Sequence, residues 1–137
     1  MSMGTGTGVA PAPASQAGAC RVLVVDDNTD AAESLAMLLR LHGHDVRLAP
    51  DGPRALAAVG DYTPDIVLLD LSLPGMGGHE VARQLRGRPG CDKALIVALT
   101  GSGSDEDREL SLQCGCDHFL VKPVDWDDID RLITGAP

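Results

Sequence analysis

Four apolar runs in the sequence each end directly before a polar side chain. They cover residues 22–25 before Asp26 and Asp27, residues 66–69 before Asp70, residues 94–99 before Thr100, and residues 119–121 before Lys122. Such runs are typical of strands buried on both faces, as in a parallel sheet covered by helices. The carboxyl ends of parallel strands lie at one edge of the sheet, and ligands bind in the crevice beyond them. We therefore expect three carboxylates, one hydroxyl and one ammonium group to meet at this edge.

The segments between these runs have the apolar spacing of helices. Leu35, Leu38 and Leu39 recur at helical spacing after the first run. Leu110 and Cys114 are expected to face inward on the helix that follows the strand ending at Thr100. A short segment after the first helix alternates as a half-exposed edge strand does. Strand and helix alternate along the chain, which predicts an α/β fold with a parallel sheet and right-handed crossovers.

The composition fits a single domain with an aliphatic core. The chain has 137 residues, of which 44% are hydrophobic and only 2% are aromatic, so the core must be built from Val, Leu, Ile and Ala. Residues 1–19 are uncharged and consist mainly of Gly, Ala, Pro, Ser and Thr. They lack the basic start and the apolar centre of a signal peptide. We interpret them as a disordered linker or a cloning remnant, and place the domain at residues 20–137.

The charge and the cysteines restrict the class of partner. The formal net charge is −9, and no basic stripe offsets it, so we expect no nucleic-acid partner. No apolar window is long enough to span a bilayer, so we expect no membrane insertion. The four cysteines lack the spacing of a disulfide framework, which indicates a reducing, cytoplasmic location.

The predicted crevice carries more negative charge than a stable fold would gather without compensation. Three converging carboxylates repel one another. A hard cation such as Mg²⁺, held by one or two carboxylates together with water and a phosphate, would supply that compensation. Lys122 offers a second, permanent positive charge. The ordered set therefore indicates a site for a divalent cation and a phosphoryl group.

Four segments carry a resemblance to a known family. They are Val-Val-Asp-Asp at 24–27, Leu-Leu-Asp-Leu-Ser-Leu-Pro-Gly-Met-Gly-Gly at 68–78, Ala-Leu-Thr-Gly at 98–101, and Phe-Leu-Val-Lys-Pro-Val at 119–124. In their order and spacing, the chain resembles the receiver domain of two-component response regulators from about residue 21 to residue 134. The resemblance implies a flavodoxin-like, doubly wound, five-stranded parallel sheet in the order 2-1-3-4-5 with five helices.

The same resemblance implies a role for each residue of the predicted crevice. Asp70 is the expected phosphoacceptor. Mg²⁺, for which Mn²⁺ can substitute, would be held by Asp26, Asp27, Asp70 and the backbone carbonyl of Ser72. Thr100 and Lys122 would hold the phosphoryl oxygens. Phe119 stands at the aromatic switch position and would turn into the space that Thr100 vacates.

The resemblance also implies a signalling role rather than an enzyme. The phosphodonor would be a histidine kinase or a histidine phosphotransfer protein, and an unidentified downstream protein would bind the switched surface. The chain would be a single-domain regulator or the terminal receiver of a hybrid histidine kinase. Two alternatives are a phosphorylation-independent binding module of the same fold and a phosphohydrolase with an aspartyl nucleophile. The hydrolase is disfavoured because Ser72 stands two residues after Asp70, where such enzymes commonly carry an acid/base Asp.

Overall fold

The computed structural model describes residues 20–71, 77–91, 93–101 and 104–134. Its strands are β2 (Arg21–Val25), β3 (Asp45–Ala49), β4 (Ile66–Asp70), β5 (Leu95–Thr100) and β6 (His118–Val121). Its helices are α1 (Thr29–Leu41), α2 (Gly52–Ala58), α3 (Gly78–Arg86), α4 (Asp105–Gln113) and α5 (Trp126–Thr134). The predicted linker, residues 1–19, lies outside the described residues. None of the described helices is long and apolar enough to cross a membrane.

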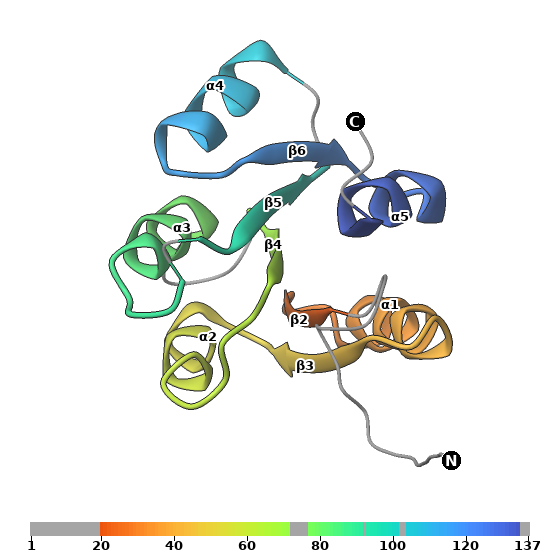
Figure 1. The fold of residues 1–137 in the computed structure, drawn as a ribbon. Helices are drawn as coiled ribbons and strands as arrows, with labels where there is room; N and C mark the ends of the chain where they lie inside the picture. Colours follow the sequence, from red (N-terminus) through yellow and green to blue (C-terminus); the bar gives the residue numbers. More distant parts are fainter. Residues whose placement is uncertain (1–19, 72–76, 92, 102–103, 135–137) are drawn as a thin grey trace, which may run out of the picture.

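The five strands are parallel and form one sheet in the order β3-β2-β4-β5-β6 (Figure 1). Counted along the chain, this is the order 2-1-3-4-5, so the predicted topology is confirmed. β3 lies at one edge, as the alternating pattern of its sequence predicts, and β6 lies at the other. β2, β4 and β5 are the central strands, and two of them deliver the acidic residues of interest.

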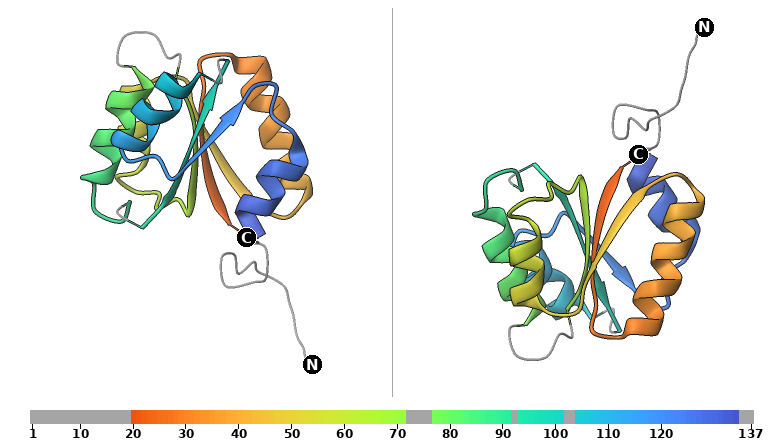
Figure 2. Two further views of the ribbon diagram at one scale, coloured as in Figure 1. Left: turned by 90° about the horizontal axis from the view of Figure 1, so that it is seen from above. Right: turned by 90° about the horizontal axis from the view of Figure 1, so that it is seen from below.

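Helices cover both faces of the sheet. α1 and α5 lie on one face, and α2, α3 and α4 lie on the other (Figures 1 and 2). Alternate strand residues point to opposite faces, so each central strand contributes to two separate cores. For example, Leu69 packs in the cluster with Leu85 of α3, while Leu68 packs in the cluster with Leu39 of α1. Both faces of these strands are buried, which explains their continuous apolar runs.

The buried side chains of α1 are not all those of the apolar pattern in its sequence. Leu39 is fully buried together with Ala32 and Ala36, whereas Leu38 is 41% exposed. Leu35 is only partly buried at the margin of the core. Two alanines at i and i+4 place the small side of the helix against the sheet, so the helix approaches closely and the flanking leucines are displaced outward.

The inward face of α4 also differs from the predicted one. Cys114 is buried as expected, but Leu110 is 43% exposed and Ser111 is fully buried instead. The pairs 110/114 and 111/114 are spaced by four and three residues, and both spacings place side chains on one face of a helix. The sequence therefore could not distinguish two rotations of this helix. The prediction for Leu110 is wrong.

Gly78 brings the start of α3 against the end of β4. A Cβ atom added at Gly78 would lie 2.6 Å from the Cα of Leu71 and 2.7 Å from the carbonyl oxygen of Asp70. Both contacts are with backbone atoms, which cannot move aside as a flexible side chain can. A glycine is therefore required here by close approach, and the main chain of Asp70 is held against α3.

We predict that Gly78→Ala destabilises the protein by about 1–3 kcal/mol, because the added methyl overpacks a backbone contact. Gly77→Ala is the matched control, since a Cβ added there has no atom of the described residues within 4 Å, its chain neighbours aside. Its free energy of unfolding should stay within about 0.5 kcal/mol of the wild type. Urea unfolding followed by far-UV circular dichroism measures both values, and equal values would contradict the close approach.

We also predict that the neighbouring leucines of α1 respond very differently to truncation. Leu39→Ala should lower the free energy of unfolding by about 2–5 kcal/mol, because it leaves a cavity in the core. Leu38→Ala should cost under about 1 kcal/mol, because much of that side chain is already in water. Urea titrations of both variants give the comparison. A larger loss for Leu38→Ala would mean that the helix is rotated relative to this structure.

Candidate functional site

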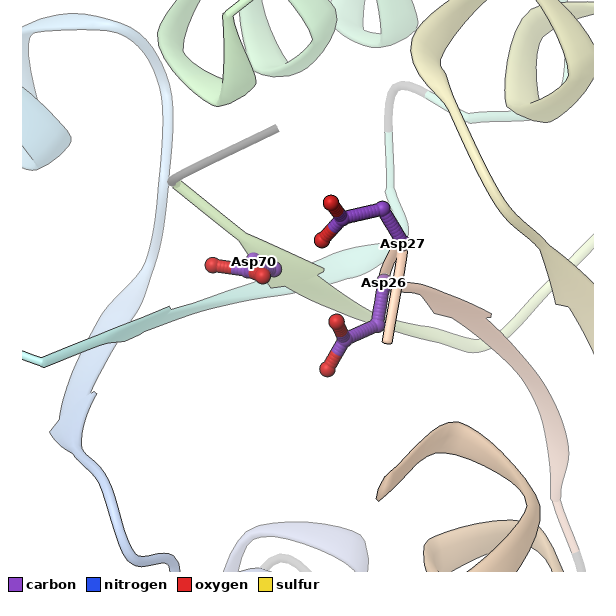
Figure 3. A group of neighbouring side chains, drawn as sticks. All are labelled: Asp26, Asp27 and Asp70. Carbon is purple, nitrogen blue, oxygen red and sulfur yellow. The ribbon is translucent and has the colours of Figure 1, made fainter. Parts of the chain in front are cut away.

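Three carboxylates lie together at the carboxyl ends of neighbouring strands. Asp26 and Asp27 directly follow β2, and Asp70 is the last residue of β4, which pairs with β2. One carboxylate oxygen from each residue lies within 4.8 Å of the others. Figure 3 shows the three side chains close together at the ends of their strands. The structure thus brings Asp70 next to two carboxylates that lie 44 and 43 positions before it in the sequence.

Two of these carboxylates are removed from water. Asp26 is 6% exposed and Asp70 is 4% exposed, whereas Asp27 is exposed at the mouth of the group. Burying an ionised carboxylate is costly unless opposite charges or hydrogen bonds compensate it. Each buried carboxylate of the cluster therefore needs a partner.

Lys122 is that partner for both buried carboxylates. Its Nζ lies 3.3 Å from Oδ2 of Asp70 and 3.4 Å from Oδ2 of Asp26. Its backbone N–H donates to the carbonyl oxygen of Thr100 at 2.7 Å, which fixes the residue after β6 to the end of β5. The Lys122 side chain is about one-third exposed, so a ligand that enters from solvent can reach it. Among the described residues, the ion pairs of Lys122 reach Asp26 and Asp70 but not Asp27, so three carboxylates lie close to one ammonium.

The loop after β2 fixes Asp26 through backbone hydrogen bonds. Oδ1 of Asp26 accepts from the N–H of Asn28 at 2.9 Å. The side chain of Asn28 in turn accepts from the N–H of Ala31 at 3.1 Å and caps the first turn of α1. Asp26 also donates its own N–H to the carbonyl of Ala49 on β3 at 3.1 Å. The helix start and the acidic cluster are therefore one hydrogen-bonded unit.

The electrostatic balance at Asp26 reflects these contacts. Burial raises the pKa of the Asp26 carboxyl above its usual value, and the neighbouring Asp70 charge raises it further. The hydrogen bond from Asn28 and the charge of Lys122 act in the opposite direction. The net shift is upward, so the ionised form is under-compensated in the protein alone. An added cation would favour the ionised form.

Thr100 and Phe119 lie on the neighbouring strands. Thr100 is a buried residue at the end of β5 and pairs in register with Val121 of β6. Phe119 lies on β6 opposite Ala98, is half-buried, and packs against the core cluster on the α3 side. Its ring faces Arg108 of α4, whose Cζ lies 5.5 Å from the ring centroid. Ser72, predicted to offer its carbonyl, lies outside the described residues.

A groove runs from the acidic cluster along α1. It has a volume of about 520 Å³ and lies between α1 and the segment that follows β6. Asp26 and Lys122 line one part of it, and Leu35, Leu38 and Val124 give it apolar walls. Leu38, which is partly exposed on α1, therefore lines the groove that leads to the carboxylates.

Sequence reasoning missed three residues that shape the site. Asn28 could have been found, because an Asn just before a helical pattern is a common N-cap. Gly78 belongs to the 68–78 segment that carries the family resemblance, but its contact with β4 depends on the tertiary packing. Arg108 had no signal, because a contact between a helix and a distant strand leaves no local pattern.

The assembled groups suit one kind of chemistry. Carboxylate oxygens are the ligands that hard divalent cations prefer, and an ammonium beside them can pair with phosphoryl oxygens. A buried carboxylate in such a setting can also act as a nucleophile towards phosphorus. The donor set therefore suits a divalent cation and a phosphoryl group.

Known proteins resemble this chain in sequence. The DNA-binding response regulator MtrA of Mycobacterium tuberculosis (strain ATCC 25618 / H37Rv) is 46% identical over 103 residues, which is 75% of this chain and 44% of MtrA. The sensory transduction protein RegX3 of Mycobacterium tuberculosis (strain CDC 1551 / Oshkosh) is 41% identical over 102 residues, covering 74% of this chain and 44% of that protein. The chain spans less than half the length of these curated relatives.

Solved structures resemble it in fold. A CheY-like response regulator receiver domain protein from Methanospirillum hungatei JF-1 has a TM-score of 0.76 at 31% identity, covering 84% of this chain and 90% of that one. The receiver domain of sensor histidine kinase PA1611 from Pseudomonas aeruginosa PAO1 has a TM-score of 0.78 at 29% identity, covering 85% and 96%. That structure contains a magnesium ion coordinated in the active-site cleft.

The prediction of no nucleic-acid partner is wrong. MtrA, at 46% identity, is a DNA-binding response regulator. The prediction rested on the net charge of −9, which describes only the residues of this chain. The net charge of a receiver domain says nothing about DNA binding by the other parts of a protein that contains such a domain. The composition of this chain therefore could not exclude a nucleic-acid partner.

The family is shown by a match to nearly the whole described region. The model of the response regulator receiver domain matches residues 22–134. This range begins in β2 and ends with α5, so it includes every strand of the sheet and all three carboxylates. With the strand order and the relatives in agreement, the chain belongs to the response regulator receiver domain family.

Proposed function

We propose that Asp70 accepts a phosphoryl group from a phosphohistidine in a Mg²⁺-dependent reaction, and that the phosphorylated domain presents an altered surface to a partner. One observation carries this proposal. The Asp70 carboxylate is buried beside the Lys122 ammonium at 3.3 Å and within a group of three carboxylates. Such a group is poorly compensated in the protein alone and well suited to a cation and a phosphoryl group.

The acidic cluster supports Mg²⁺ as the cation. Its donor atoms are carboxylate oxygens from Asp26, Asp27 and Asp70, and Asp27 is open to solvent, so ligand water has access. These three residues would hold the ion, with the backbone carbonyl of Ser72 as a further expected ligand. When bound, Mg²⁺ neutralises charge that develops on the phosphoryl oxygens and orients them.

The protein's own groups would then carry the transfer. An oxygen of Asp70 attacks phosphorus, the phosphorus–nitrogen bond of the donor breaks, and the imidazole leaves with the electron pair of that bond. The Lys122 ammonium, already beside Asp70, pairs with a phosphoryl oxygen of the product. The Thr100 hydroxyl at the end of β5 donates a hydrogen bond to another phosphoryl oxygen. The groove beside Asp26 and Lys122 offers a donor side chain a route to these groups.

The switch would follow from the position of Thr100 and Lys122. Both would move towards a new phosphoryl dianion, and the ring of Phe119 would occupy space that Thr100 leaves. The bond from the N–H of Lys122 to the carbonyl of Thr100 couples the ends of β5 and β6, which supports a joint movement. Phosphorylation would shift an existing equilibrium between two arrangements.

The relatives suggest two settings for such a domain. MtrA is a DNA-binding response regulator, and PA1611 is a sensor histidine kinase. The identity to MtrA is 46%, against 29% for the PA1611 receiver, and so we favour control of a DNA-binding function as the output. We also propose that residues 20–137 form the receiver domain after a linker at 1–19. A cytoplasmic location is supported by the four cysteines, which are thiols in the structure.

We predict that the protein, incubated with Mg²⁺ and acetyl phosphate, gains a single phosphoryl group that hydroxylamine removes. Asp70→Asn should gain none, because the amide cannot act as the nucleophile. Asp61→Asn, which changes an exposed carboxylate outside the cluster, should be labelled like the wild type. Intact-protein mass spectrometry measures the labelling. Equal labelling of Asp70→Asn and the wild type would exclude Asp70 as the acceptor.

We predict that Asp27→Asn weakens Mg²⁺ binding by about tenfold or more, because it removes a carboxylate ligand. Asp30→Asn is the matched control, since Asp30 is exposed in the first turn of α1 and lies outside the cluster. Its Kd should change by less than about twofold, because exposed charges are screened. Calorimetric titration with Mg²⁺ measures both. Similar losses in the two variants would indicate nonspecific attraction rather than ligation.

A further inference from the structure

The Phe119 ring is in contact with a residue that the proposed chemistry does not use. Arg108 lies on α4, and its Cζ is 5.5 Å from the centroid of the Phe119 ring on β6. A guanidinium within about 6 Å of a ring centroid is attracted to the π face. Asp105, Glu106 and Glu109 of the same helix are acidic, yet the guanidinium lies over the ring. The contact therefore joins two elements that are distant in sequence.

α4 is lightly attached to the rest of the domain. Among its described side chains only Ser111 is buried, while Leu110 and Leu112 are exposed. The helix packs mainly against β6, the strand that carries Phe119 (Figure 1). Because α4 buries so little apolar area, a single contact between α4 and β6 contributes a large part of the free energy that fixes the position of the helix.

We propose that Arg108 is a positioning residue that holds the Phe119 ring in its present place and ties α4 to β6 through it. The proposal deepens the proposed function and rests on it, because the ring is the group expected to move when Asp70 is phosphorylated. A ring that turns towards the space left by Thr100 leaves the guanidinium. α4 then loses this contact, and the exposed surface that includes Leu110 and Leu112 changes its position relative to β6. Arg108 thus sets the equilibrium between the two positions of the Phe119 ring. Through the same contact, a movement of the ring changes the position of α4.

The size of the effect follows from the strength of the contact. A cation–π contact at an exposed site changes a two-state population by about two- to fivefold. Removing it should raise the fraction of inward-turned ring in the unphosphorylated protein by that factor. By linkage, the affinity for a phosphoryl mimic that selects the inward ring should rise by up to the same factor.

The ring can be observed directly, because Phe119 is the single phenylalanine of the chain. Protein made with ring-¹³C phenylalanine shows the resonances of this ring alone, with and without Mg²⁺ and beryllofluoride. In free Arg108→Gln, the resonances should move towards those of the beryllofluoride complex, and beryllofluoride affinity should increase about two- to fivefold. Arg108→Lys, which keeps a cation, should lie between Arg108→Gln and the wild type. Arg131→Gln on α5 is the control and should match the wild type.

Each outcome decides the proposal. Ring resonances and beryllofluoride affinity in Arg108→Gln equal to those of the wild type would overturn it, as would equal shifts in Arg131→Gln. If the wild type binds beryllofluoride and is labelled on Asp70 but Arg108→Gln leaves the ring unmoved, only this inference fails. If the wild type neither binds beryllofluoride nor is labelled, the proposed function fails and the inference fails with it. Arg108→Lys keeps the test decisive should Arg108→Gln unfold.

Discussion

The contact between Lys122 and the two buried carboxylates is the interaction on which the arrangement of the site depends. Asp26 and Asp70 end up side by side because their strands are neighbours, and the sheet gives them no means of moving apart. A single ammonium at 3.3 and 3.4 Å makes this proximity tolerable. It does so incompletely, since Asp27 adds a third charge and the pKa of Asp26 is raised. This incomplete compensation of charge supports the proposal that the site binds a cation.

The residues at this edge of the sheet differ in how firmly they are held in position. Asp26 belongs to a capped helix start, and the main chain of Asp70 is pressed against α3, so these residues have fixed positions. Phe119 is half-buried on an edge strand, and the helix over it is lightly packed. This combination of a fixed Asp70 and a less tightly packed Phe119 supports the proposal that the domain binds a small group at one place and changes its surface at another.

Much of the fold and the place of the site were predictable from the sequence, for physical reasons. Strands buried on both faces read as apolar runs, and the residue after each run lies at the carboxyl edge of the sheet, so the apolar pattern places Asp26 and Asp70 at the same edge. That their two strands are direct neighbours was implied by the family resemblance, and the structure confirms it. Two kinds of information were missing. Side chains three or four residues apart lie on the same face of a helix, so the sequence could not show whether Leu110 or Ser111 faces inward with Cys114. Contacts between distant elements, such as Arg108 with Phe119, leave no local pattern in the chain.

The close approach at Gly78 has a consequence for the direction of any movement. With no room for even a methyl group between α3 and the end of β4, the end of β4 is in direct backbone contact on that flank. If Asp70 is phosphorylated as proposed, a displacement of its main chain towards α3 would meet this backbone contact, whereas β5 and β6 lie to one side of β4 in the sheet. A glycine that lacks a side chain would in this way restrict the directions in which the domain can rearrange.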